Sequence, residues 1–113
     1  MHEASLAIEV VRILEAQADR LRSITRVELE VGTLACVEAL TLRSAIEAAV
    51  RGTLADGALI HVVVTPAKAR CGACGHEEAP PDRVTPCSAC GSPRRTWLAG
   101  DALKVRAVEG VGR

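Results

Sequence analysis

Four cysteines have the chemical type and the spacing needed to bind one metal ion. Cys71, Cys74, Cys87 and Cys90 form the pattern C-x2-C-x12-C-x2-C. Two thiolates three positions apart can bind one side of an ion, and two such pairs complete a tetrahedron. A glycine follows each pair and tolerates the positive φ of a tight turn. The pattern predicts a closed, structural zinc site, with iron or a redox role for the thiols as alternatives.

A second candidate ligand lies at the start of the chain. His2 places an imidazole beside the amino terminus and the first backbone amides, and Glu3 adds a carboxylate. Nitrogen ligands in a square-planar arrangement suit Ni(II) or Cu(II) rather than zinc. The alternative is a solvated terminal histidine with no ligand role, and the residue types alone favour that alternative.

Other polar residues have simpler interpretations. We expect His76 to be a solvated loop residue, His61 to lie on a strand without binding metal, and Cys36 to pack as a small apolar side chain. Three arginines near the cysteines are expected to offset the negative charge of the cluster, with phosphate contact as the alternative: Arg83, Arg94 and Arg95. The sequence has no Ser-His-Asp candidate and no phosphate-binding glycine loop, so we predict no catalytic residues and no enzyme.

Composition narrows the class of protein. The 113 residues include 14 basic and 14 acidic side chains, so the formal net charge is zero, which argues against a nucleic-acid partner. We find no signal peptide and no apolar run of membrane length, and we therefore expect a cytoplasmic protein without a membrane partner. Trp97 is the only aromatic residue, so the core must be aliphatic.

Apolar periodicity predicts the elements that position these residues. Residues 4–22 have apolar side chains every three or four positions and predict a helix. Residues 24–32 alternate between apolar and charged side chains and predict a half-buried strand. A second helix is predicted at 38–51, and a second strand at 58–65 is closed by Pro66.

The periodic pattern stops between Pro66 and about Arg95, where Pro, Gly and Cys dominate. A third strand begins near Leu103, with a basic face that would pair with the acidic face of residues 24–32, and residues 109–113 predict a frayed tail. The predicted fold class is α+β: a small three-stranded sheet with two helices plus an inserted zinc-knuckle or ribbon minidomain. The predicted domains are 1–66 with 96–113, an α/β domain that carries the candidate nickel ligands, and 67–95, a zinc-binding minidomain.

The whole sequence resembles the HypA-type hydrogenase nickel-incorporation proteins, the HypA/HybF family of nickel metallochaperones. The resemblance lies in the Met1-His2-Glu3 opening, the paired cysteine knuckles, and these segments: Val31-Gly32-Thr33-Leu34, Cys36-Val37-Glu38, Gly52-Thr53, Gly57-Ala58 and Leu103-Lys104-Val105. The chain departs from the family in the second helix, where members often carry phenylalanines and this chain has Leu42 and Ala45.

This resemblance implies a nickel metallochaperone for the maturation of nickel–iron hydrogenase. It implies that His2 is the essential side-chain ligand of Ni(II), with Glu3 beside it and backbone nitrogens near Met1 assisting, and that the four cysteines hold structural zinc. The implied partners are a HypB-type GTPase, the hydrogenase large subunit and, because some members also serve urease, urease maturation proteins. A monomer or weak homodimer is expected. The alternative function is a zinc-ribbon adaptor that binds nucleic acid or a protein partner without nickel.

Overall fold

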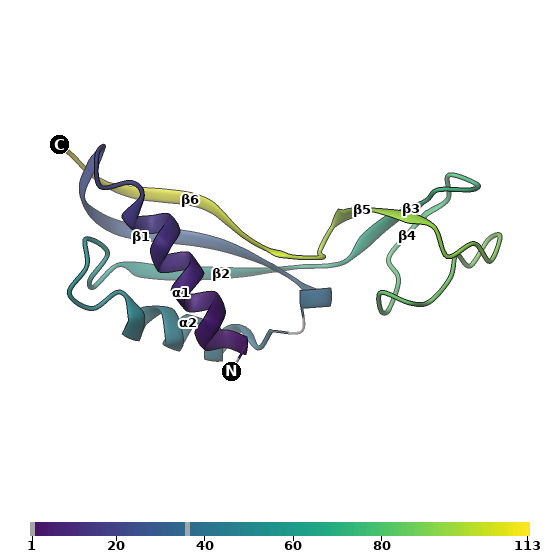
Figure 1. Cartoon of the computed structure of the whole chain (residues 1–113), viewed down its shortest axis with the longest axis horizontal. Coiled ribbons are helices and arrows are strands. Elements are labelled where there is room, and N and C mark those ends of the chain that lie inside the picture. The colour runs from purple at the N-terminus through teal and green to yellow at the C-terminus, as the bar shows by residue number, and fades with distance from the viewer. Residues whose placement is uncertain (1, 36) are drawn as a thin grey trace. The chain divides into compact units, whose positions relative to one another are not determined.

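The computed structural model describes residues 2–35 and 37–113 (Figure 1). Its elements are α1 (His2–Glu15), β1 (Leu21–Gly32), η1 (Thr33–Ala35), α2 (Ala39–Ala49), β2 (Leu59–Thr65), β3 (Lys68–Cys71), β4 (Glu77–Glu78), β5 (Arg95–Ala99) and β6 (Leu103–Gly112). The chain divides into two compact units. Unit 1 comprises Met1–Glu30, Val37–Val63 and Lys104–Arg113, and unit 2 comprises Val31–Cys36 and Val64–Leu103. The predicted α+β class is confirmed.

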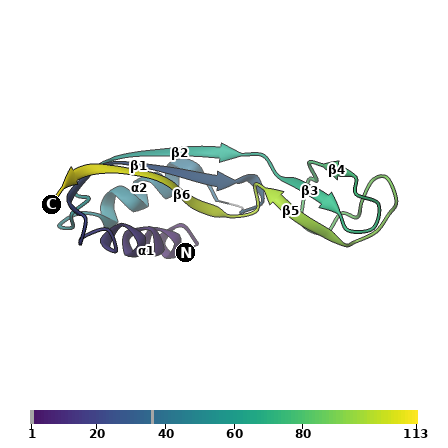
Figure 2. The same ribbon diagram turned by 90° about the horizontal axis from the view of Figure 1, so that it is seen from above.

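Unit 1 is built on a three-stranded sheet with the strand order β2-β1-β6. Strands β1 and β2 run in the same direction and β6 runs in the opposite direction (Figure 2). A parallel pair needs a long crossover connection, and α2 lies within it. Helices α1 and α2 contact each other and cover one face of this sheet (Figure 2). The two predicted helices therefore form one layer and the strands form the other.

The core of unit 1 is aliphatic, as the near absence of aromatic residues requires. Its buried side chains come from both helices, the sheet and the connection between α2 and β2: Ala7, Val10, Leu14, Ile24, Val27, Leu29, Leu42, Ile46, Val50, Ala55, Ala58 and Ile60. In β1, Val27 and Leu29 are each 0% exposed, which confirms the alternation predicted for this strand. Full burial of each larger side chain stabilises the fold by about 1.5–3 kcal/mol, so hydrocarbon packing dominates here.

The first helix is shorter than predicted, because it ends at Glu15 rather than near residue 22. Residues 16–20 form turns, and strand β1 already begins at Leu21. Ala18 and Leu21 continue the helical spacing of apolar residues, which is why the pattern predicted a longer helix. Pairing within the sheet outweighs that local preference.

The carboxyl-terminal residues are ordered, so the predicted frayed tail is wrong. Strand β6 extends to Gly112, and the amide of Arg113 donates to the carbonyl of Arg20 at 3.0 Å. The charge pairing predicted for this strand is confirmed, because the Arg106 Nε lies 3.6 Å from a Glu28 carboxylate oxygen.

Glu38 is the N-cap of helix α2. Its carboxylate accepts hydrogen bonds from the amide of Leu40 at 3.2 Å and from both the amide and the hydroxyl of Thr41 at 2.7 Å. These donors, the Thr41 hydroxyl foremost, lower the pKa of the Glu38 carboxyl. The side chain thus satisfies amides that the first helical turn leaves without partners.

Unit 2 contains a second three-stranded sheet, with the order β4-β3-β5 and antiparallel pairing on both sides of β3. The sequence analysis did not predict these strands. In β3, Ala69 and Cys71 are buried while Lys68 and Arg70 are exposed. This alternation is a strand signal, but it is only four residues long and lies among turn-forming residues.

Two glycines allow segments of unit 2 to approach each other closely. The amide of Gly32 donates to the carbonyl of Ala102 at 3.0 Å, and the amide of Leu34 donates to the carbonyl of Gly100 at 3.1 Å. A Cβ atom on Gly32 would lie 2.1 Å from the carbonyl carbon of Gly100, which itself has a φ of 74°. Neither position can carry a side chain unless the backbone moves.

Candidate metal centre

The four predicted cysteine ligands come together in unit 2. Their Sγ atoms all lie within 4.8 Å of one another, with 3.6 Å between Cys71 and Cys90 and 3.7 Å between Cys74 and Cys87. Four sulfurs placed about 2.3 Å from one zinc ion at tetrahedral angles are about 3.8 Å apart. A disulfide requires about 2 Å, and these cysteines are free thiols. The geometry and the donor set fit a tetrathiolate zinc site.

The two halves of the cluster repeat the same turn. The amide of Gly75 donates to the carbonyl of Cys71 at 3.1 Å, and the amide of Gly91 donates to the carbonyl of Cys87 at 2.8 Å. Both glycines have positive φ values, 80° and 77°. The amide of Ala73 also donates to the Cys71 sulfur at 3.3 Å. The similar sequences of the two pairs therefore fold into similar knuckles that aim their sulfurs at one point.

Backbone donors and burial give these thiols unequal acidities. The amides of Cys74 and Ala73 lower the pKa of Cys71 to about 6, because they stabilise its thiolate. At Cys74, the amide of His76 lowers the pKa, but burial and the neighbouring cysteine sulfurs outweigh it and raise the pKa to about 12. A divalent ion must displace the more tightly held protons, so metal affinity falls as the pH falls.

A carboxylate joins the two knuckles to each other. Glu78, on β4, accepts a hydrogen bond from the Ser88 amide at 3.0 Å and one from the Ser88 hydroxyl at 2.7 Å. The Ser88 hydroxyl is the main reason that the pKa of Glu78 is lowered. Since Ser88 directly follows Cys87, this contact holds the second knuckle against the strand that leaves the first. This role was not predicted from the sequence, because a Glu among turn-forming residues carries no distinguishing signal.

Arg83 and Arg95 lie on the ring of Trp97, with guanidinium carbons 5.6 Å and 5.5 Å from its centroid. Arg83 donates to the carbonyl of Asp101, whereas Arg95 donates to the carbonyl of Thr85. The predicted cations therefore have defined partners near the cysteines, and Arg95 is half-buried.

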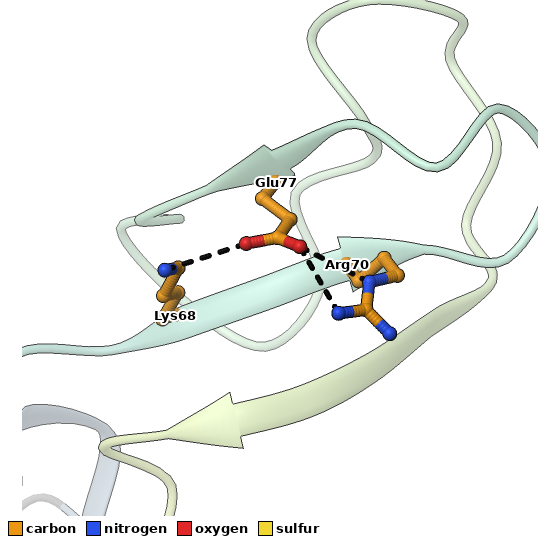
Figure 3. Close-up of polar contacts among 3 residues, drawn as sticks. All are labelled: Lys68, Arg70 and Glu77. Carbon is orange, nitrogen blue, oxygen red and sulfur yellow. Dashed lines mark hydrogen bonds and ion pairs between the residues drawn. The ribbon is translucent and has the colours of Figure 1, made fainter.

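A separate ion cluster lies on the surface of the second sheet. Glu77 lies between Lys68 and Arg70, with its carboxylate 3.3 Å from the lysine Nζ and 3.0 Å from an arginine Nη (Figure 3). The hydrogen bond from Arg70, with a smaller contribution from Lys68, lowers the pKa of the Glu77 carboxyl. All three side chains are well exposed to water, so this cluster adds little stability.

The predicted nickel ligands are only partly within the described structure. Helix α1 begins at His2 and includes Glu3, but Met1 and the His2 side chain lie outside the described residues. Cys36 also lies outside them. His61 lies on β2, as predicted, and is exposed, and His76, beside the first knuckle, is exposed as predicted. The roles of these residues stay predictions. Among the described residues, no helix is both long and apolar enough to cross a bilayer.

Comparison with known proteins identifies one family over nearly the whole chain. The sequence model of the family described as "Hydrogenase/urease nickel incorporation, metallochaperone, hypA" matches residues 1–110. The hydrogenase maturation factor HypA of Azotobacter chroococcum is 41% identical over 111 residues, which cover 96% of this chain and 98% of the relative. The hydrogenase maturation factor HybF of Klebsiella pneumoniae is 38% identical over 112 residues, covering 97% and 99% of the two chains.

Solved structures agree with the fold. The solution structure of the Ni metallochaperone HypA from Helicobacter pylori matches all of this chain and all of its own chain, with a TM-score of 0.77 at 21% identity. A second solution structure of a HypA protein covers 96% of this chain with a TM-score of 0.63. The fold is therefore one that has been solved before.

Proposed function

Because this chain belongs to the HypA family, we propose that it binds Ni(II) at its amino terminus and helps to deliver the ion during maturation of nickel–iron hydrogenase. It is a nickel metallochaperone of hydrogenase maturation, and its cysteine cluster suits structural zinc. The observation that carries this function is the family match across residues 1–110, which includes the amino-terminal residues as well as the cysteines. The zinc-ribbon adaptor alternative is not favoured, because it does not explain the amino-terminal part of that match.

We assign Ni(II) to His2 and Glu3, with backbone nitrogens near Met1, and zinc to Cys71, Cys74, Cys87 and Cys90. Helix α1 begins at His2, and the amides of a first helical turn have no acceptor within the helix, which supports a role for backbone nitrogen. A terminal site with few ligands can be approached by an incoming ligand, whereas a closed tetrathiolate site cannot. This difference suits nickel transfer at the first site and a structural role at the second.

The partners and setting proposed here follow from the family. The relatives are maturation factors, so the protein belongs with the hydrogenase maturation machinery. Within it we propose a HypB-type GTPase and the hydrogenase large subunit as direct partners, with urease maturation proteins as a further client. We place the protein in the cytoplasm as a monomer or weak homodimer, without catalytic residues. The functional division into residues 1–66 with 96–113 for nickel and 67–95 for zinc is part of this proposal.

Calorimetry with Ni(II) on the untagged, zinc-loaded protein tests the nickel assignment. We expect His2→Ala to weaken Ni(II) binding by more than the roughly 10–100-fold that loss of an outer ligand partner costs. His61→Ala and His76→Ala are matched controls, because they remove the two other histidines of the chain. Residues added before Met1 should also weaken binding if the terminal amine is a ligand. Full Ni(II) affinity and full hydrogenase maturation in His2→Ala would overturn the proposal.

A further inference from the structure

We propose that Arg95 is a positioning residue of the metal centre, whose buried Nη1–H group donates a hydrogen bond to a cysteine thiolate when the metal is bound. This inference rests on the zinc site proposed above and adds to it a cationic partner for the sulfurs. Three independent features of unit 2 support it: strand register, a shared cavity and an unpaired buried donor.

The register of the second sheet places Arg95 opposite a ligand. Strands β3 and β5 are antiparallel, and Cys71 and Arg95 are direct partners across the ladder. Side chains of directly opposite residues lie on the same face, with Cβ atoms about 4.5–5.5 Å apart. The side chain of Arg95 therefore leaves the sheet beside that of Cys71, the first cysteine of the cluster.

Arg95 and two of the four cysteine ligands line the same small cavity. It is lined by Ala69, Cys71, His76, Glu78, Cys87 and Arg95. The Glu78 carboxylate in this lining accepts a hydrogen bond from Ser88 at each of its oxygens, and the positive charge of Arg95 contributes to the lowering of its pKa. The thiol groups of Cys71 and Cys87, both buried, are the other side-chain acceptors that become anionic when metal binds.

One nitrogen of Arg95 lacks an acceptor. Its Nη2 donates to the carbonyl of Thr85, and its guanidinium carbon lies over the Trp97 ring. Its Nη1 is buried without a hydrogen-bond partner, the one side-chain nitrogen or oxygen in this condition among the described residues. A buried donor left unpaired is destabilising, and more so when it is charged. A thiolate in the same cavity would satisfy it.

The chemistry of the pair is complementary. Four thiolates around one divalent ion carry about two negative charges, and a charge-assisted hydrogen bond from arginine offsets part of that charge. Hydrogen-bond partners of metal ligands change metal affinity by about 10–100-fold. Arg83 also lies on Trp97, but it donates to the carbonyl of Asp101 and does not line the cavity, so it is a matched control.

Cobalt(II) substitution tests the hydrogen bond through the sulfur-to-cobalt charge-transfer band. We expect Arg95→Met to shift this band to lower energy, because a thiolate without a cationic donor gives up its electrons more readily. Arg95→Met should also weaken zinc binding about tenfold or more in chelator competition. Arg83→Met should leave the band and the affinity unchanged. An Arg95→Met protein with the wild-type band and wild-type affinity overturns the inference.

Nuclear magnetic resonance of the wild-type protein gives a test that does not depend on the folding of a variant. Replacing zinc with cadmium should move the guanidinium proton and nitrogen resonances of Arg95, while those of Arg83 stay in place. Unmoved Arg95 resonances overturn the inference even if Arg95→Met fails to fold. Wild-type protein that does not bind about one zinc per chain would instead contradict the zinc site itself, so the two failures are distinguishable.

Discussion

The two units of this chain are held together by different means. Unit 1 buries a continuous set of aliphatic side chains between two helices and a sheet. In unit 2, the buried apolar side chains among the residues that the structure describes are Val31, Ala67, Ala69, Cys71, Pro80 and Cys87, and two of these six belong to metal ligands. Small apolar side chains cannot offset the entropy of ordering so many turns. Unit 1 should therefore fold on hydrocarbon packing, and unit 2 should depend on metal.

Loss of one sulfur ligand tests this contrast with the largest expected effect. Cys87→Ser should release zinc and unfold unit 2, because apparent zinc-binding energies of small sites, about 10–16 kcal/mol, match or exceed the whole stability of a domain. The amide resonances of residues 64–103 should collapse while those of helices α1 and α2 stay dispersed. Cys36→Ser, which changes the one cysteine outside the cluster, should keep one zinc per chain. Equal loss of both units in Cys87→Ser would contradict the contrast.

A substitution that leaves a cavity in the aliphatic core should destabilise unit 1 and leave the zinc site of unit 2 intact. Leu42 is 0% exposed and Leu40 is 66% exposed on the same helix. Leu42→Ala should lower the free energy of unfolding of unit 1 by about 2–5 kcal/mol, whereas Leu40→Ala should change it by less than about 0.5 kcal/mol. Urea unfolding followed by far-ultraviolet circular dichroism measures this effect, because both helices belong to unit 1. Zinc stoichiometry should not change in either variant, and loss of zinc in Leu42→Ala would show that the units are not independent.

A smaller effect concerns the N-cap of α2 and its pH dependence. The pKa of Glu38 is lowered from its ordinary value of 4.5, so its ionised form stabilises the folded state. That stability is fully present above the unfolded-state pKa and is lost as the pH falls through the lower folded-state pKa. Glu38→Gln should therefore lose less stability than the wild type when the pH is lowered from about 6 to about 3. Urea unfolding across this range measures the difference.

Glu47→Gln is the matched control for this measurement. Glu47 lies on the same helix and forms an exposed pair with Arg43 at 4.0 Å. We expect this variant to follow the wild-type pH dependence. A Glu38→Gln variant that follows the wild type equally well would show that the cap does not contribute.

Strong periodicity made unit 1 largely predictable. The β1 alternation and the α2 stripe place Val27, Leu29, Leu42 and Ile46 in the core, as the structure confirms. The errors concern the ends of elements. Apolar residues continue at helical spacing past Glu15, but the helix ends there and strand β1 begins at Leu21. Residues 109–113 were predicted to fray as a chain end, yet the lack of a side chain at Gly110 allows close approach to the Ser23 carbonyl. The local sequence pattern does not indicate which distant strand a segment will pair with.

In unit 2, the cysteine ligands were predictable, but the strands and hydrogen bonds that hold them in place were not. Cysteine spacing predicts the cluster directly, because two C-x2-C pairs in a chain of this size have few other uses. The short strands β3 and β5 carry too few residues for a periodic signal. Consequently the register that sets Arg95 opposite Cys71 could not be read from the sequence. The contact between Glu78 and Ser88 likewise joins residues whose types are common on any surface.

The close backbone contact between Gly32 and Gly100 limits which substitutions this sequence can accept. At Gly32 even the Cβ of an alanine would collide with the backbone of Gly100. A Cβ added at Gly100 would in turn collide with the backbone of Ala67. By contrast, Val84 is 84% exposed in the long loop between the knuckles. A position such as Val84 can therefore take other residue types without displacing a neighbour, whereas Gly32 and Gly100 can change only if several segments shift together.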